Sequence, residues 1–85
     1  MEEIIGALET IEKALRTGND PSAVQTAIRT ARNKTASSSD ERLKQLAAEL
    51  LTWESKFPVI WREPAGRQGM AKHAGHWIEK LKGRK

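Results

Sequence analysis

Cysteine and tyrosine are absent from this chain, and its only aromatic residues are three tryptophans and one phenylalanine. Without cysteine there can be no disulfide, no thiolate metal site and no cysteine nucleophile. Long apolar runs are also missing, and no segment approaches the roughly 20 residues that a membrane-spanning helix needs. The acidic opening MEEIIGALE lacks the pattern of a signal peptide. We therefore expect a cytoplasmic protein with no membrane span.

Enzyme motifs are missing too: the chain has neither a Gly-x-Ser-x-Gly nor a His-Glu-x-x-His sequence. Several acidic residues stand four positions before a lysine or arginine, as in Glu9–Lys13 and Glu12–Arg16. This spacing is typical of a solvated helix surface. A domain this small has little room to bury an acid and shift its pKa. We predict no enzymatic activity, no catalytic residue, no cofactor and no small-molecule substrate.

Apolar residues recur every three or four positions in four segments, which is the spacing of amphipathic helices. The segments cover residues 2–17, 21–34, 39–56 and 67–82. The third has the strongest pattern, with Ala47 and Leu51 beside a stripe formed by Leu43, Leu46, Leu50, Trp53 and Phe57. No strand pattern of any length interrupts them. The sequence predicts an all-α fold, a compact antiparallel bundle of about four helices.

The ends of these helices are marked by glycine, proline and capping residues. Gly18 stops the first helix, Asp20 caps the second, and Ser38 with Glu41 has the spacing of a capping box for the third. Because Pro58 disfavours helical geometry at the residue before it, we expect a short irregular or one-turn segment at 58–63. At 85 residues the chain predicts one helical domain, 1–85, with a disordered basic tail at 83–85.

Positive charge is concentrated in the last third of the chain. The net charge is +4, but residues 56–85 hold eight Lys/Arg and only two Asp/Glu. This asymmetry indicates a polyanionic partner, or alternatively a solvated tail that keeps the protein soluble. The candidate polyanion-binding residues are Arg62, Arg67, Lys72, Lys80, Lys82, Arg84 and Lys85. A possible extension of that surface comprises Arg29, Arg32, His73 and His76.

The stretch EPAGRQGMAKHAGHW, residues 63–77, allows several interpretations. Its Pro/Gly segment is either a plain turn between helices or a loop where a phosphate meets Arg67 at a helix start. Ala71 and Gly75 have the spacing of a helix-turn-helix motif, although Trp77 continues the apolar stripe as one unbroken helix.

The same stretch contains both histidines of the chain. His73 and His76, with Glu79 three residues further on, would supply a metal with too few ligands, because no other His or Cys exists to complete the set. We predict that no metal is bound and that both imidazoles lie on the surface.

Two functional hypotheses follow from these patterns. The first is a non-enzymatic helical binding module whose basic C-terminal surface contacts nucleic-acid backbone without sequence specificity. The alternative is a protein–protein adaptor or regulatory subunit that docks through Trp61 and the region of the third and fourth helices, or that forms a homodimer through the stripes of the first and third. Trp61 is either packed in the core or exposed as a stacking platform or partner anchor.

Overall fold

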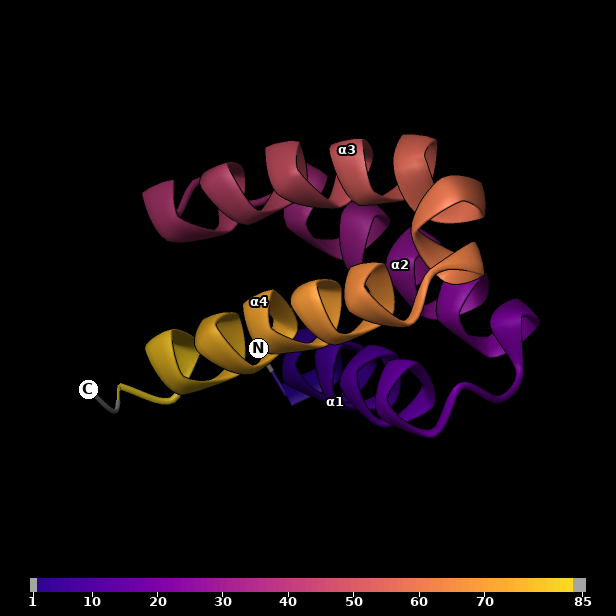
Figure 1. Ribbon diagram of the computed structural model, residues 1–85. Helices are drawn as coiled ribbons and strands as arrows, with labels where there is room; N and C mark the ends of the chain where they lie inside the picture. Colours follow the sequence, from indigo (N-terminus) through magenta and orange to yellow (C-terminus); the bar gives the residue numbers. More distant parts are fainter. Residues whose placement is uncertain (1, 84–85) are drawn as a thin grey trace.

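The computed structural model describes residues 2–83, which form four α-helices and no strand (Figure 1). The helices are α1 (Glu2–Thr17), α2 (Pro21–Ala36), α3 (Glu41–Arg62) and α4 (Pro64–Leu81). Consecutive helices run antiparallel, and α4 returns to lie along α1, so that each helix has two main neighbours. The predicted all-α, antiparallel four-helix bundle is confirmed. None of the helices in the described part of the chain has the length and apolar character to span a membrane.

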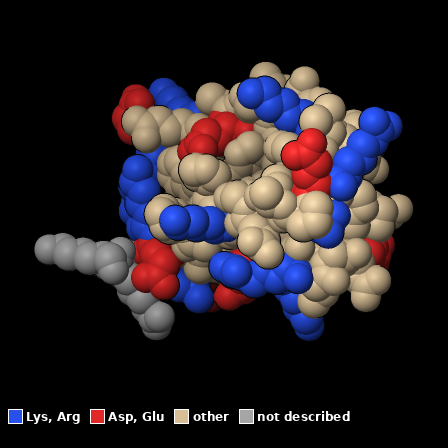
Figure 2. Space-filling view, viewed as in Figure 1, with Lys and Arg blue, Asp and Glu red and all other residues tan. Residues whose placement is uncertain are grey.

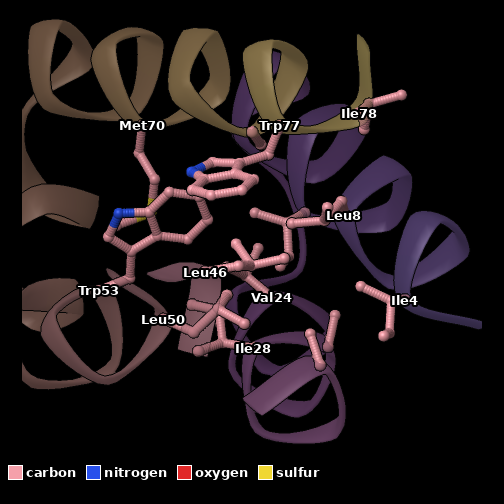
Figure 3. Close-up of a cluster of buried hydrophobic side chains, with 14 of the residues drawn as sticks. Ile4, Leu8, Val24, Ile28, Leu46, Leu50, Trp53, Met70, Trp77 and Ile78 are labelled. Carbon is pink, nitrogen blue, oxygen red and sulfur yellow. The ribbon is translucent and has the colours of Figure 1, made fainter. Parts of the chain in front are cut away.

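A single hydrophobic core lies between the helices, and each helix contributes one stripe to it. Figure 3 shows Trp53 of α3 meeting Met70 and Trp77 of α4 inside the bundle. The stripes predicted from sequence are buried, but Leu51 is not: 55% of its surface is exposed. The buried apolar residues are Ile4, Leu8, Ile11, Leu15, Val24, Ala27, Ile28, Ala31, Leu43, Leu46, Leu50, Trp53, Phe57, Met70, Ala71, Ala74, Trp77, Ile78 and Leu81.

The turn between α1 and α2 follows the sequence prediction. Gly18 has a positive φ of 68°, which a glycine adopts without strain, and α1 ends there. The side chain of Asp20 accepts a hydrogen bond from the backbone N–H of Ala23, and Pro21 occupies the first helical position.

The start of α3 differs from the prediction, because Asp40 and not Ser38 caps the helix. The carboxylate of Asp40 accepts a hydrogen bond from the N–H of Arg42 at 2.8 Å. The hydroxyl of Ser38 instead accepts from the N–H of Asp40 at 3.1 Å, which fixes the turn before the helix. The helix therefore begins at Glu41, two residues later than predicted, while α2 continues to Ala36.

Pro58 bends α3 but does not end it, and the segment predicted as separate at 58–63 is mostly the last turns of this helix. Proline has no N–H to donate to the preceding turn, and Pro58 lies on the exposed side of the helix. Phe57 is buried and Trp61 half-buried against the core, which holds these turns in place. In Figure 1 they turn down toward α4, which begins at Pro64 after the single extended residue Glu63.

Candidate polyanion-binding surface

A groove of about 810 Å³ runs between α1 and α4 on the surface of the bundle. Gly75 of α4 leaves room for the side chain of Glu12 on α1: a Cβ at Gly75 would stand 2.8 Å from a carboxylate oxygen of Glu12. The groove is lined by Arg16, Lys72, Gly75, His76, Glu79, Lys80 and Gly83. We call this the α1–α4 groove.

The α4 side of this groove carries a line of basic groups. Lys72, His76 and Lys80 stand four residues apart, so they share one exposed face of the helix. Within residues 2–83 neither lysine forms an ion pair, although the Lys80 ammonium lies 4.7 Å from the centre of the Trp77 ring. The carboxylate of Glu79 also lines the groove, so the surface is mixed in sign with an excess of positive charge.

The α1 side adds Arg16, which is not among the binding residues predicted from the sequence. Its guanidinium donates to Glu12 at 3.0 Å, which is the helix-surface pair expected from their spacing. Arg16 also lines a second, smaller hollow together with Gln68 and Lys72. No pattern in the sequence places Arg16 beside Lys72, because they meet only when α1 and α4 pack together.

Arg67 is occupied within the molecule. Its guanidinium donates a hydrogen bond to the carbonyl of Trp61, lies 5.6 Å from the centre of that ring, and reaches over Gly18 at the end of α1. Arg67 thus ties the end of α3 to the turn between α1 and α2. The stretch predicted to be a Pro/Gly loop is the first two turns of α4, and the N–H of Arg67 already donates to the carbonyl of Glu63. The loop that was to hold a phosphate beside Arg67 is therefore not formed.

The remaining candidate cations lie in different parts of the molecule. Lys82 pairs with Glu9 across α4 and α1 at 3.4 Å. Arg62 is exposed at the end of α3 and does not line the α1–α4 groove. Arg84 and Lys85, and with them most of the predicted tail 83–85, lie outside the described residues.

Arg29 and Arg32 do not extend the groove. Both lie on α2, whose main neighbours are α1 and α3, and both point at Glu54 of α3, with nitrogen–oxygen distances of 3.7 and 3.4 Å. Figure 2 shows that on the viewed face, too, acidic side chains stand among the lysines and arginines. The basic groups are thus dispersed, and the structure brings only some of those predicted into one groove.

The histidines lie on the surface of α4. His73 and His76 line a hollow of about 300 Å³ between α3 and α4, where Glu49 accepts a hydrogen bond from the indole N–H of Trp77. Within the described range, 2–83, no three His, Asp or Glu side chains gather in a way that could hold a metal ion.

Three further alternatives from the sequence concern Gly75, Trp61 and the apolar stripes of α1 and α3. Gly75 lies in the middle of α4, which is continuous from Pro64 to Leu81, so the helix-turn-helix interpretation is wrong. Trp61 packs against Phe57, with ring centroids 5.5 Å apart, and Arg67 covers it. The apolar stripes of α1 and α3, which the homodimer hypothesis used, are buried in the core.

Comparison with protein-family models, with curated proteins and with solved structures finds no match to this chain.

Proposed function

We propose that this protein is a non-enzymatic binding module of the cytoplasm whose α1–α4 groove binds nucleic-acid backbone without sequence specificity. The observation that carries the proposal is the line of Lys72, His76 and Lys80 on α4 facing Arg16 of α1 across one groove. Lys72 and Lys80 need no ion pair within the described residues to be broken before they can bind an anion. The cost of binding is correspondingly low.

The spacing of these groups suits an extended polyanion better than a single small anion. Lys72 and Lys80 are eight residues apart, which is about 12 Å along the helix axis. A backbone with a phosphate at every nucleotide can satisfy both lysines and Arg16 at once, with release of condensed counterions. Lysine acts as a point charge, and its contact with a phosphate does not depend on the identity of the neighbouring base. Sequence specificity is therefore not expected.

The test is a fluorescence anisotropy titration with a labelled duplex of random sequence and with the corresponding single strand, each at several salt concentrations. We expect binding that weakens with salt, log K falling against log[salt] with a slope of about −0.9 for each duplex phosphate neutralised. Each of the variants Lys72→Glu and Lys80→Glu should weaken binding and reduce that slope by about one phosphate.

The matched control is Lys13→Glu, which makes the same charge change at an exposed lysine of α1 outside the lining of the groove. If Lys13→Glu weakens binding as much as Lys72→Glu does, net charge and not the groove governs the interaction, and the proposed site is wrong. If the unaltered protein binds neither oligonucleotide at low salt, the proposed function itself is wrong.

A further inference from the structure

The outward face of α3 carries an exposed stripe that no other part of the described chain covers. Six exposed residues follow one another at spacings of three or four, which places them on one side of the helix, with Val59 and Arg62 beyond the bend at Pro58. They are Lys44, Ala48, Leu51, Ser55, Val59 and Arg62. We call them the α3 outer stripe.

The middle of the α3 outer stripe is uncharged and partly apolar. Leu51 is 55% exposed and Val59 is 65% exposed, and they are the two large apolar side chains that stand out on the described surface. Single exposed apolar residues are ordinary, but here the two lie on the same line with only Ser55 between them. A partner can make apolar contacts with the stripe residues between Lys44 and Arg62 without desolvating a charged group, because none of these residues is charged.

The border of the stripe is basic. Lys44 and Arg62 stand at its two ends, and Lys56 is exposed beside it. Within residues 2–83 neither Lys56 nor Arg62 forms an ion pair, and Lys44 has only a 3.8 Å contact with Glu41 at the start of the helix.

Two of the three carboxylates of α3 are directed elsewhere, while the third, Glu41, lies beside Lys44. Glu49 is turned toward α4, where it accepts from the indole of Trp77. Glu54 is turned toward α2 and its two arginines. Glu63, just beyond Arg62, lies at the start of α4, where the positive end of the helix dipole favours a carboxylate. The border of the outer stripe thus keeps an excess of positive charge, carried by Lys56 and Arg62, with Lys44 next to Glu41.

The geometry points to the α3 outer stripe as a docking surface for an acidic amphipathic segment of another protein. Such a segment would set apolar side chains on Leu51 and Val59, and carboxylates near Lys44, Lys56 and Arg62. Such a contact would pack one amphipathic helix against another, as in a coiled coil, with apolar anchors supplying affinity and the charged border supplying selectivity. This inference does not depend on the proposed nucleic-acid function, which uses another face of the bundle.

A second copy of the chain fits this surface less well than an acidic segment. A symmetric dimer would place the same stripe on itself, and a basic border then meets a basic border. The charge pattern thus favours an acidic partner of different sequence.

The experiment uses the full chain and two labelled synthetic peptides of about 20 residues, long enough to form helix. Both peptides carry one leucine stripe; one has glutamates on the flanking positions and the other has lysines. In anisotropy titrations we expect the glutamate peptide to bind and the lysine peptide not to bind. Amide chemical shifts of the ¹⁵N-labelled protein should change along residues 44–62, on α3.

Variants of the stripe sharpen the test. Leu51→Glu and Val59→Glu should each weaken binding of the glutamate peptide by at least about tenfold, as loss of an interface anchor does. Lys44→Glu combined with Arg62→Glu should reverse the preference, so that the lysine peptide binds better. Gln25→Glu, an exposed change of the same charge on α2, should leave binding of the glutamate peptide unaltered. Circular dichroism checks that each variant keeps its helix content.

Several results would overturn the inference. The first two are equal binding of both peptides and binding unaffected by Leu51→Glu. Light scattering that shows a dimer, lost in Leu51→Glu, would make the occupant a second copy. If Leu51→Glu weakened the binding of duplex DNA and Lys72→Glu did not, the α3 outer stripe would be a nucleic-acid site. Loss of nucleic-acid binding in Lys72→Glu, with peptide binding retained, would leave both proposals standing on separate faces.

Discussion

Gly66 and Gly69 lie one turn apart in α4, but their surroundings differ. A Cβ at Gly66 would stand 2.8 Å from the carbonyl oxygen of Ile60 and 3.3 Å from its Cα, both atoms of the α3 backbone. A Cβ at Gly69 would meet nothing within 4 Å. Gly66 is therefore what allows α4 to start immediately beside the end of α3, whereas Gly69 serves no such close contact.

We expect Gly66→Ala to lower the free energy of unfolding by about 1–3 kcal/mol, since backbone must move to make room. Gly69→Ala should raise it by roughly 0.5–1 kcal/mol, because alanine has the higher helix propensity and space is free. Urea denaturation followed by circular dichroism measures both. The pair is its own control, and an increase in stability for both variants would show that the α3–α4 junction tolerates a side chain at Gly66.

At the scale of the element, the start of α3 depends on one carboxylate. Asp40 caps the helix through the N–H of Arg42 and also pairs with the Arg42 guanidinium at 3.3 Å. Those hydrogen bonds from Arg42 hold the pKa of Asp40 below its usual value of 3.8. A carboxyl group whose pKa is depressed by folding stabilises the folded state above its unfolded pKa, and loses that effect as the pH falls through the folded pKa.

The variant Asp40→Asn keeps an oxygen acceptor for the cap but cannot titrate. We therefore expect the unaltered protein to be more stable than Asp40→Asn at pH 7, with the difference shrinking as the pH falls below about 4. Urea unfolding midpoints at both pH values test this. In an Arg42→Gln background the difference at pH 7 should be smaller, and an unchanged difference there would mean that the Arg42 guanidinium does not cause the lowered pKa.

At the scale of the whole molecule, the four helices share one core. The structure measures 34 × 25 × 16 Å with a radius of gyration of 11.8 Å. All three tryptophans lie in α3 and α4, while Leu8 of α1 is fully buried at the centre. Because α1 packs against both α2 and α4, a cavity at Leu8 weakens contacts on both sides of the bundle.

Leu8→Ala should destabilise the protein by about 2–5 kcal/mol, against a total stability of roughly 4–13 kcal/mol for a domain of this size. If the bundle unfolds as one unit, the midpoint from tryptophan fluorescence in α3 and α4 should shift as far as the midpoint from circular dichroism. Comparing the two denaturation curves is the measurement. A fluorescence midpoint that stayed in place while the circular dichroism midpoint fell would show that the α1–α2 hairpin unfolds independently.

The positions of the helices could largely be predicted from the sequence, because an amphipathic stripe and its caps are local features. The stripe from Leu43 to Phe57 and the stop at Gly18 are examples, and both occur as predicted. The bounds around Pro58 could not be predicted, because propensity at a proline competes with the burial of Phe57 and Trp61, and only the packed core decides between them. Likewise, Asp40 and Ser38 are both of residue types that cap helices well, and only the geometry of the turn makes Asp40 the cap of α3.

The candidate site was less accessible to sequence reasoning. Lys72 and Lys80 could be found from their positions on one helix, whereas Arg16 comes from the opposite end of the chain. Arginine is a common phosphate ligand, but in the folded protein the guanidinium of Arg67 donates its hydrogen bond to the carbonyl of Trp61. In the sequence Leu51 stands next to the core stripe of α3, but in the structure its position around the helix axis directs it to the surface.

By itself, then, the sequence determined the all-α class, four helices, one core and an excess of positive charge near the end of the chain. These depend on periodicity, capping and composition, which act over a few residues. Only the tertiary structure decided which charges stand together, which are paired and which face of α3 stays uncovered. Those outcomes depend on which helices are neighbours, and contacts between residues far apart in the chain are not encoded in any local pattern.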